Sequence, residues 1–271
     1  MDERTAMQHA LDLAWRGWGR VHPNPLVGAV VLDGGEAVGE GWHAEYGAQH
    51  AEPIALAAAG ARARGATLVV TLEPCAHQGQ QPPCVDAILR AGIRRVVAAL
   101  PDPNPVAAGG AARLREAGIP VELGPGRDAA EAQNAAFLHG LSNPERPFVA
   151  LKLATSLDGR IADLEGRSRW ISGSEARGYV HWLRAGFDAI GVGGRTARAD
   201  DPSLTVRGAV TPRVPPGRVI FDAAADLPGS LGLVRSASEV PTFVVASRQA
   251  PAARLTALER AGVRVVAASL A

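Results

Sequence analysis

The sequence has little of several features that would point to particular classes of protein. Its 271 residues include only two cysteines, aromatic residues make up 4%, and 28 basic residues nearly match 27 acidic ones. A net charge of +1 gives no field that would draw the chain to nucleic acid or to an anionic membrane. No apolar run reaches the roughly 18 residues that a membrane helix needs. We therefore expect neither nucleic acid nor a membrane as a partner.

The N-terminus also lacks the pattern of a signal peptide. Its first residues, Met1 to Arg4, do not place a charged segment before an apolar one. We therefore expect a cytoplasmic protein, and we also expect a homo-oligomer. In a reducing compartment the two cysteines, Cys75 and Cys84, are better suited to metal binding or catalysis than to a disulfide.

The sequence does contain enough apolar residues, 47%, to bury two cores of ordinary size. The first half alternates short apolar runs with helical patterns, which predicts an α/β fold with a mixed sheet. A turn at 33–35 predicts an antiparallel hairpin between the first two strands. We expect strands at 26–32, 67–72 and 95–100, and helices at 50–64, 83–91, 109–117 and 128–141.

A polar segment with two prolines, 142–147, follows the last of these helices and is typical of a domain boundary. We therefore predict two domains, 1–144 and 145–271. The second half again mixes strand and helix patterns, which predicts another α/β domain. Its expected strands are 148–154, 189–192 and runs near Val219 and Phe243, and its expected helices are 174–184 and 251–261.

One histidine and two cysteines stand at the ends of predicted elements in the first half. His50 opens a helix, whereas Cys75 and Cys84 lie between a strand and the next helix. Three such ligands suit a catalytic zinc site, which keeps its fourth position for water. Glu52, two residues after His50, is placed to act as a general acid and base without binding the metal.

Taken singly, these residues are more typical of a helix cap, inert buried thiols and an ordinary acidic first turn. Together, the order His-x-Glu, then Pro-Cys, then a second Cys is the signature of zinc deaminases. The cysteine spacing is unusual, because eight residues separate Cys75 from Cys84 where the common signature has two.

Longer motifs resemble the bifunctional deaminase-reductase family of riboflavin biosynthesis, and they occur in both halves in the family's order. The motifs are 22–28 (HPNPLVG), 71–77 (TLEPCAH), 82–84 (PPC), 102–105 (DPNP), 152–154 (KLA), 156–160 (SLDGR), 199–202 (ADDP) and 204–207 (LTVR). The resemblance implies a cytidine-deaminase-like three-layer domain with a mixed sheet. It implies a dihydrofolate-reductase-like α/β domain behind it.

For the first domain, the resemblance implies a hydrolase that removes the 2-amino group of 2,5-diamino-6-(5-phosphoribosylamino)pyrimidin-4-one. One Zn²⁺ per chain, held by the three ligands named above, would supply the nucleophile, and Glu52 would be catalytic. Asn24 and His77 would contact this small phosphorylated pyrimidine substrate. Ala76 and Gln81 replace residues that are usually hydroxylic in the family.

The second half resembles an oxidoreductase that uses NADPH to convert the ribosyl group to a ribityl group. At the positions that match the family's cofactor-binding residues, the resemblance implies contacts from Ala154, Trp170, Thr196 and Asp200. The substrate contacts would be Ser168, Arg184, Leu204 and Arg207. The polar residues nearest to hydride transfer would be Lys152 and Asp200. Arginines suit the substrate's phosphate because their planar fork matches its oxygens.

Two other functions remain open at this point. A tRNA or nucleoside deaminase would share the metal chemistry, and a zinc-stabilised, non-catalytic assembly protein would keep the ligands. The near-neutral charge, the long cysteine spacing and the second domain disfavour the first. The presence of Glu52 disfavours the second, because a structural zinc site does not need it.

The second half departs from the family in two ways that bear on its activity. The chain ends at Ala271, before a glycine-rich turn that helps to hold cofactor and substrate in the family, and Asp222 is followed by Ala223 where a serine is common. We therefore expect an incomplete reductase domain, with deamination intact and NADPH-dependent reduction weak or absent. The measurement is NADPH oxidation with the deaminated product, run beside the deaminase assay. Substrate-dependent oxidation that keeps pace with deamination would contradict this expectation.

Overall fold

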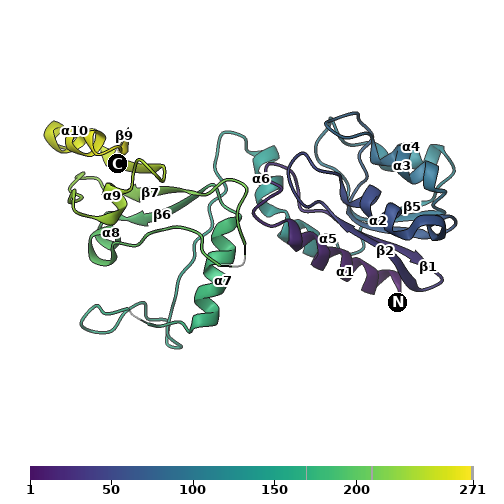
Figure 1. Ribbon diagram of the computed structural model, residues 1–271, viewed down its shortest axis with the longest axis horizontal. Coiled ribbons are helices and arrows are strands. Elements are labelled where there is room, and N and C mark those ends of the chain that lie inside the picture. The colour runs from purple at the N-terminus through teal and green to yellow at the C-terminus, as the bar shows by residue number, and fades with distance from the viewer. Residues whose placement is uncertain (169, 209, 270–271) are drawn as a thin grey trace. The chain divides into compact units, whose positions relative to one another are not determined.

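The computed structural model describes residues 1–168, 170–208 and 210–269. The chain divides into two compact units, Met1–Leu153 and Ala154–Ala271 (Figure 1). The predicted domain boundary between residues 144 and 145 stays a prediction. The expected end of the reductase domain at Ala271 lies outside the described residues. Within the described ranges, every helix falls short of the length and hydrophobicity of a membrane span.

A five-stranded mixed sheet forms the centre of the first unit, as the sequence predicts. Its order is β2-β1-β3-β4-β5. The strands are β1 (Gly28–Asp33), β2 (Glu36–Trp42), β3 (Thr67–Leu72), β4 (Arg95–Leu100) and β5 (Val121–Leu123). The predicted hairpin is confirmed, because β1 pairs antiparallel with β2 and with β3, whereas β3, β4 and β5 run parallel. The carboxyl ends of β3 and β4 therefore meet at one edge of the sheet.

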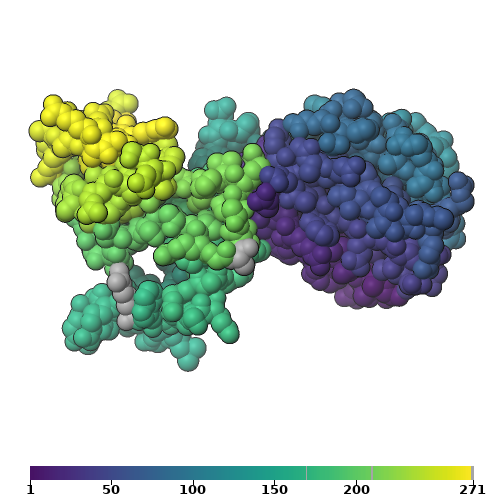
Figure 2. Space-filling view, in the orientation of Figure 1, coloured from purple at the N-terminus to yellow at the C-terminus, as the bar shows by residue number. Residues whose placement is uncertain are grey.

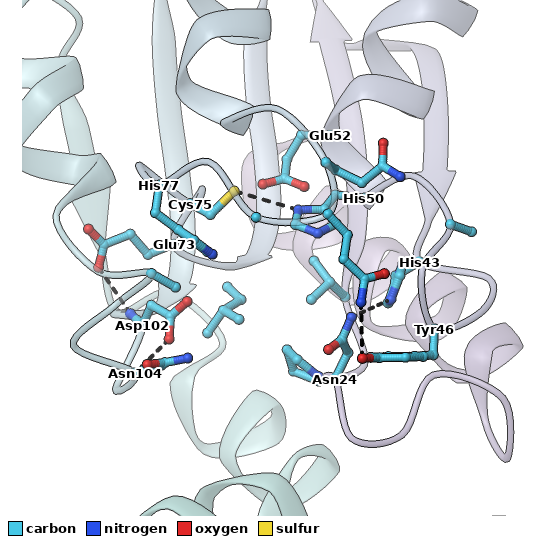
Figure 3. Close-up of a pocket in the computed structure, with 18 of the residues that line it drawn as sticks. Asn24, His43, Tyr46, His50, Glu52, Glu73, Cys75, His77, Asp102 and Asn104 are labelled. Carbon is cyan, nitrogen blue, oxygen red and sulfur yellow. Dashed lines mark hydrogen bonds between the residues drawn. The ribbon is translucent and has the colours of Figure 1, made fainter.

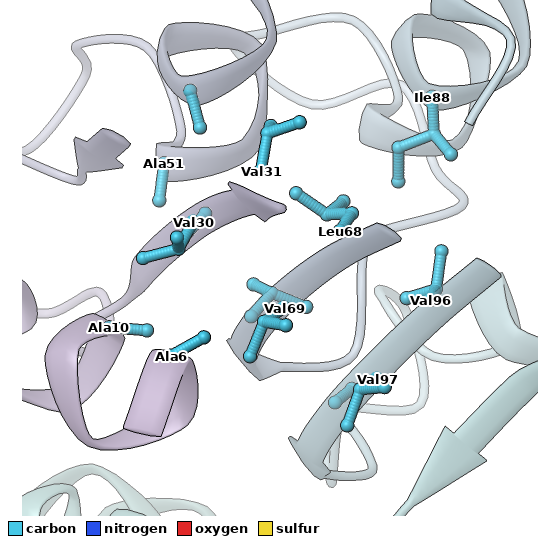
Figure 4. Packing of buried hydrophobic residues seen from close by; sticks show 14 of the residues in the cluster. Ala6, Ala10, Val30, Val31, Ala51, Leu68, Val69, Ile88, Val96 and Val97 are labelled. Atoms are coloured by element: carbon cyan, nitrogen blue, oxygen red, sulfur yellow. The ribbon is translucent and has the colours of Figure 1, made fainter. Parts of the chain in front are cut away.

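Helices cover both faces of this sheet. They are α1 (Glu3–Ala14), α2 (Ala51–Ala59), α3 (Cys84–Ala91), α4 (Gly110–Glu116), α5 (Arg127–Gln133) and α6 (Ala135–Ser142), with short 3-10 helices at Trp15–Gly17 and Gly60–Ala63. Neighbouring strand residues alternate between the faces, so Val69 lies on the side of α1 and Leu68 on the side of α2 and α3 (Figure 4). All six residues of β3 are buried, as expected for a strand covered on both faces.

Two helical features of the first unit differ from the sequence prediction. The helix at α1 was not predicted, because much of its buried face consists of small alanines such as Ala6 and Ala10 that give a weak periodic signal. The single helix predicted at 128–141 is two helices that meet at Asn134. The buried Asn134 side chain accepts from the Leu26 N–H (2.8 Å) and donates to the Leu26 carbonyl (3.0 Å), which ties this junction to the loop before β1.

The second unit is built on a four-stranded parallel sheet in the order β6-β7-β8-β9. The strands are β6 (Ala189–Gly193), β7 (Gly217–Phe221), β8 (Thr242–Ser247) and β9 (Arg264–Ala268). The helices are α7 (Ser174–Ala185), α8 (Gly194–Asp200), α9 (Gly232–Arg235) and α10 (Ala252–Arg260). Its core contains the fully buried Ile220 and Val244, and the second predicted α/β domain is therefore confirmed.

The strand predicted at 148–154 is wrong. The chain from Asn143 to Gly173 contains neither a strand nor a helix among its described residues, and the side chains of Val149 (79% exposed) and Leu151 (83% exposed) face solvent. Later residues of the stretch lie in the teal-green part of the surface in Figure 2. The prediction failed because alternating apolar residues favour a strand only where a neighbouring strand accepts and donates its backbone hydrogen bonds.

The close approach of α2 to β2 gives a stability prediction. A Cβ atom at Gly41 would lie 2.3 Å from the Ala51 carbonyl oxygen and 2.6 Å from the Ala55 nitrogen. The helix α2 can therefore pack this closely against β2 only because residue 41 is a glycine. We expect Gly41→Ala to lower the free energy of unfolding by at least about 1–3 kcal/mol, the scale of overpacking. Urea denaturation would measure this.

The matched control is Gly140→Ala in α6, where an added Cβ meets nothing within 4 Å. This change should leave the free energy of unfolding unchanged or raise it by up to about 1 kcal/mol, because alanine is the better helix former. Equal stabilities for the two variants would contradict the tight contact between α2 and β2.

Candidate active site

Two helix starts and one strand end converge at the site. His50 is the N-cap residue of α2, Cys84 is the first residue of α3, and Cys75 comes three residues after the end of β3. Because α2 and α3 both begin here, their backbone N–H groups and positive dipole ends lie near the two sulfur atoms. This environment stabilises thiolates, which are the form of cysteine that binds metals.

The three predicted ligands lie together. Their donor atoms are all within 4.8 Å of one another, with His50 Nδ1 3.2 Å from Cys84 Sγ. The same nitrogen lies 3.6 Å from Cys75 Sγ (Figure 3). Tetrahedral zinc at its usual bond lengths would place such atoms roughly 3.5–3.8 Å apart. Neither cysteine forms a disulfide, and both are buried. One nitrogen and two sulfur donors at this separation fit a zinc ion that keeps a position for water.

Hydrogen bonds to Cys75 Sγ favour its thiolate form. The Cys84 backbone N–H donates to Cys75 Sγ at 3.4 Å. Hydrogen bonding from Cys84, followed by that from His50, lowers the pKa of the Cys75 thiol. The same contact with Cys75 raises the pKa of His50, which burial opposes.

Glu52 lies in the first turn of α2 beside this cluster and is 3% exposed. Burial raises its pKa to about 7, although the nearby His50 works in the opposite direction. A carboxyl group with this pKa can both accept and donate a proton at neutral pH. Figure 3 shows its carboxylate next to the His50 ring and Cys75, which is the position predicted for a general acid and base.

A cavity of about 270 Å³ opens beside the ligand cluster. Both residues predicted to contact substrate, Asn24 and His77, line it. The buried Nδ1 atom of His77 has no hydrogen-bond partner among the described residues, so it is available to a polar atom of a ligand. Several other lining residues were not predicted as site residues, namely His43, Tyr46, Glu73, Asp102 and Asn104.

His43 fixes the orientation of the Asn24 amide. Its Nδ1 lies 3.0 Å from the Gln49 carbonyl oxygen and therefore carries the proton, so its Nε2 accepts from Asn24 Nδ2 at 3.1 Å. Burial lowers the pKa of His43, which keeps the ring neutral. No motif in the sequence marks His43, whereas Asp102 and Asn104 belong to the DPNP motif at 102–105 and could have been found from it.

In the second unit the structure brings together three of the predicted substrate contacts. Arg184 of α7 donates from Nη1 to the Thr205 carbonyl at 3.1 Å, and the Arg207 N–H donates to His181 Nδ1 at 3.1 Å. Burial, followed by the charge of Arg207, lowers the pKa of Arg184. Leu204 lies between them in sequence, is buried, and has a φ of +50°. Two neighbouring guanidinium groups suit an anion such as a phosphate.

The remaining predicted residues of the reductase lie on different elements. Thr196 and Asp200 are both on α8, directly after β6. Trp170 is exposed, with the Arg177 guanidinium 4.5 Å from its ring centroid. The others lie in the stretch without strands or helices, and they are Lys152, Ala154 and Ser168.

Two protein families match the two halves of the chain. Residues 1–100 match the cytidine and deoxycytidylate deaminase zinc-binding region, which includes His50, Glu52, Cys75 and Cys84. Residues 147–270 match the RibD C-terminal domain.

Curated relatives match most of this chain. The riboflavin biosynthesis protein RibD of Aquifex aeolicus is 45% identical over 91% of this chain and 69% of its own length. The RibD of Escherichia coli strain K12 is 50% identical over 76% of this chain and 56% of its own length. The chain thus spans between about half and two thirds of the length of these curated relatives.

Solved structures agree with this result. Acinetobacter baumannii RibD (form 1) matches with a TM-score of 0.78 and 40% identity over 99% of this chain and 74% of its own. The Thermotoga maritima diaminohydroxyphosphoribosylaminopyrimidine deaminase/5-amino-6-(5-phosphoribosylamino)uracil reductase matches with a TM-score of 0.79 and 38% identity, over 97% and 80%. With a zinc-deaminase half and a reductase half in this order, the chain belongs to the RibD family of riboflavin biosynthesis.

Proposed function

We propose that the first unit hydrolyses the 2-amino group of 2,5-diamino-6-(5-phosphoribosylamino)pyrimidin-4-one and releases ammonia. The observation that carries this proposal is the cluster of His50, Cys75 and Cys84 with the buried Glu52 beside it. Family membership supports the choice of substrate, because the Thermotoga maritima relative is named for this deamination. A cytoplasmic location and a homo-oligomeric state stay predictions.

His50, Cys75 and Cys84 would hold one zinc ion per chain. When bound, zinc supplies a nucleophile by lowering the pKa of a coordinated water toward neutrality. The protein's part is to present one imidazole nitrogen and two sulfurs from rigid helix starts and a strand end. His50 and Cys75 line the cavity, so the cluster borders the space that the substrate ring would occupy.

Glu52 carries the protons of the reaction. The hydrolysis replaces the C–N bond to the amino group with a C–O bond, so the water's protons must reach a ring nitrogen and then the departing amine. A carboxyl group with a pKa of about 7 accepts a proton from water and returns it without a large energetic cost in either direction. Its burial also keeps the carboxylate from exchanging protons with bulk solvent.

Asn24 and His77 orient the pyrimidine ring in the cavity. The hydrogen bond that Asn24 donates to His43 holds the Asn24 amide in one orientation. The Nδ1 atom of His77, which has no partner among the described residues, offers one more hydrogen bond. The apolar side chains of Val27, Leu72 and Phe137 line the same cavity and help to exclude water.

For the second unit we propose a site for NADPH and for the phosphoribosyl substrate, built from the residues of a reductase. The assay of NADPH oxidation with the deaminated product measures how much reduction this site carries out. Arg184, Leu204 and Arg207 would hold the substrate together with Ser168, and the two arginines would face its phosphate. The residues proposed to hold the cofactor are Ala154, Trp170, Thr196 and Asp200. Lys152 and Asp200 are proposed as the polar groups nearest to hydride transfer.

The metal assignment predicts one zinc ion per chain after purification without chelator. Cys75→Ser should lose most of this zinc and most ammonia release, because a serine hydroxyl is a poor zinc ligand. Elemental analysis of both proteins is the measurement, with Ser247→Ala, in the second unit, as the control. Full zinc content in Cys75→Ser would contradict the assignment.

The proton-transfer assignment predicts that Glu52→Gln keeps zinc and fold but loses deamination by about 10²- to 10⁴-fold, the usual contribution of a positioned general acid and base. The glutamine has the same shape but cannot accept and return the proton. Turnover should be measured as ammonia released from the diaminopyrimidine phosphate, with zinc content determined on the same sample. Near-normal turnover would show that another group carries the proton.

A further inference from the structure

We propose that Glu73 is a positioning residue of the deaminase, which holds the turn at Asp102–Asn104 against the cavity and thereby sets the affinity for substrate. This inference rests on the proposed deaminase function. Glu73 lies directly after β3 and two residues before Cys75, and it is 7% exposed. A carboxylate buried to this extent requires hydrogen-bond donors around it.

Both donors of Glu73 are backbone N–H groups from other segments of the chain. Its Oε2 accepts from Asp102 at 3.0 Å, and its Oε1 accepts from Ala111, in the first turn of α4, at 2.8 Å. Figure 3 shows the carboxylate directed toward the Asp102 backbone and away from His50. One side chain thus links the end of β3 to the loop after β4 and to the start of α4.

The conformation of the turn depends on where Asp102 is held. Asp102 Oδ1 accepts from the Asn104 N–H at 2.9 Å, and Asn104 Oδ1 accepts from the Val106 N–H at 3.1 Å. The three hydrogen bonds therefore form a series: Glu73 holds Asp102, Asp102 holds Asn104, and Asn104 holds Val106. Asp102 and Asn104 both line the cavity, so a shift of the turn changes the wall that the substrate meets.

The contacts of Glu73 separate it from the metal and from proton transfer. Within the described residues, the cluster that could hold an ion consists of His50, Cys75 and Cys84 and does not include Glu73. Both of its oxygens are engaged by the backbone. Its effect should therefore appear in substrate binding, whereas the metal content and the chemical step should change little.

The test uses the full chain and the variant Glu73→Gln. A glutamine has one oxygen and one NH₂ group, so it can accept only one of the two N–H donors and directs its own donor at the other. We expect KM for the diaminopyrimidine phosphate to rise about tenfold or more, the scale of one buried donor left unsatisfied. We expect kcat to stay within about threefold and zinc to stay at one per chain.

Two control variants in α4 separate positioning from loss of stability. Leu114→Ala removes a fully buried side chain of the core and should lower Tm while leaving KM unchanged. Glu116→Gln changes an exposed glutamate and should leave both unchanged. A rise in KM for Glu73→Gln that Leu114→Ala does not share supports positioning.

An unchanged KM in Glu73→Gln would overturn the proposal, and so would a loss of zinc with a parallel fall in kcat. If Glu73→Gln does not fold, Glu73→Asp decides by the same criterion, because its shorter carboxylate cannot span both donors. Failure of the wild-type chain to release ammonia from the diaminopyrimidine phosphate would instead reject the proposed function itself.

Discussion

The site depends on the packing of α2 and α3 against one face of the sheet, because this packing brings two helix starts to the end of β3. Gly41 lets α2 approach β2 closely, and His50 at the N-cap of α2 therefore lies 3.2 Å from Cys84 at the start of α3. The parallel pairing of β3 and β4 adds the loop of Asp102 at the same edge. The proposed ligands, the proposed proton carrier and the cavity wall thus all follow from one arrangement of helices over strands.

Burial divides the roles of the charged groups in this arrangement. Glu52 and Glu73 are both buried carboxylates near the same cysteine, yet their surroundings differ. Glu73 accepts from two backbone N–H groups and is held in a structural position. The pKa of Glu52 is raised to about 7 mainly by burial, which suits a group that exchanges a proton. The different surroundings of the two carboxylates support the orienting role proposed for Glu73 and the proton-transfer role proposed for Glu52.

The sequence was informative where local pattern and structure coincide. Strands β3 and β4 were predicted with their observed bounds because both are short, largely apolar runs with a Val-Val pair at their centre or near their start. The ligands were found because their spacing follows the chemistry of zinc deaminases. Prediction from the sequence failed where tertiary contacts determine the local structure. The helix α1 was missed because it buries alanines, and the predicted helix at 128–141 breaks at Asn134 because that side chain bonds to Leu26. His43 was missed for the same reason, since only folding brings it to the cavity, whereas Glu73 lies in the motif at 71–77 and could have been found from it.

We have proposed that this site acts on a small diaminopyrimidine phosphate. The most direct measurement is ammonia release by the purified, zinc-loaded protein from that compound, from cytidine and from an RNA oligonucleotide at equal concentrations. The cavity of about 270 Å³ and the net charge of +1 both favour a small molecule over a polyanion. Ammonia release from the diaminopyrimidine phosphate should be well above that from the other two compounds. Faster release from RNA, or no release from any of them by zinc-loaded protein, would contradict this proposal.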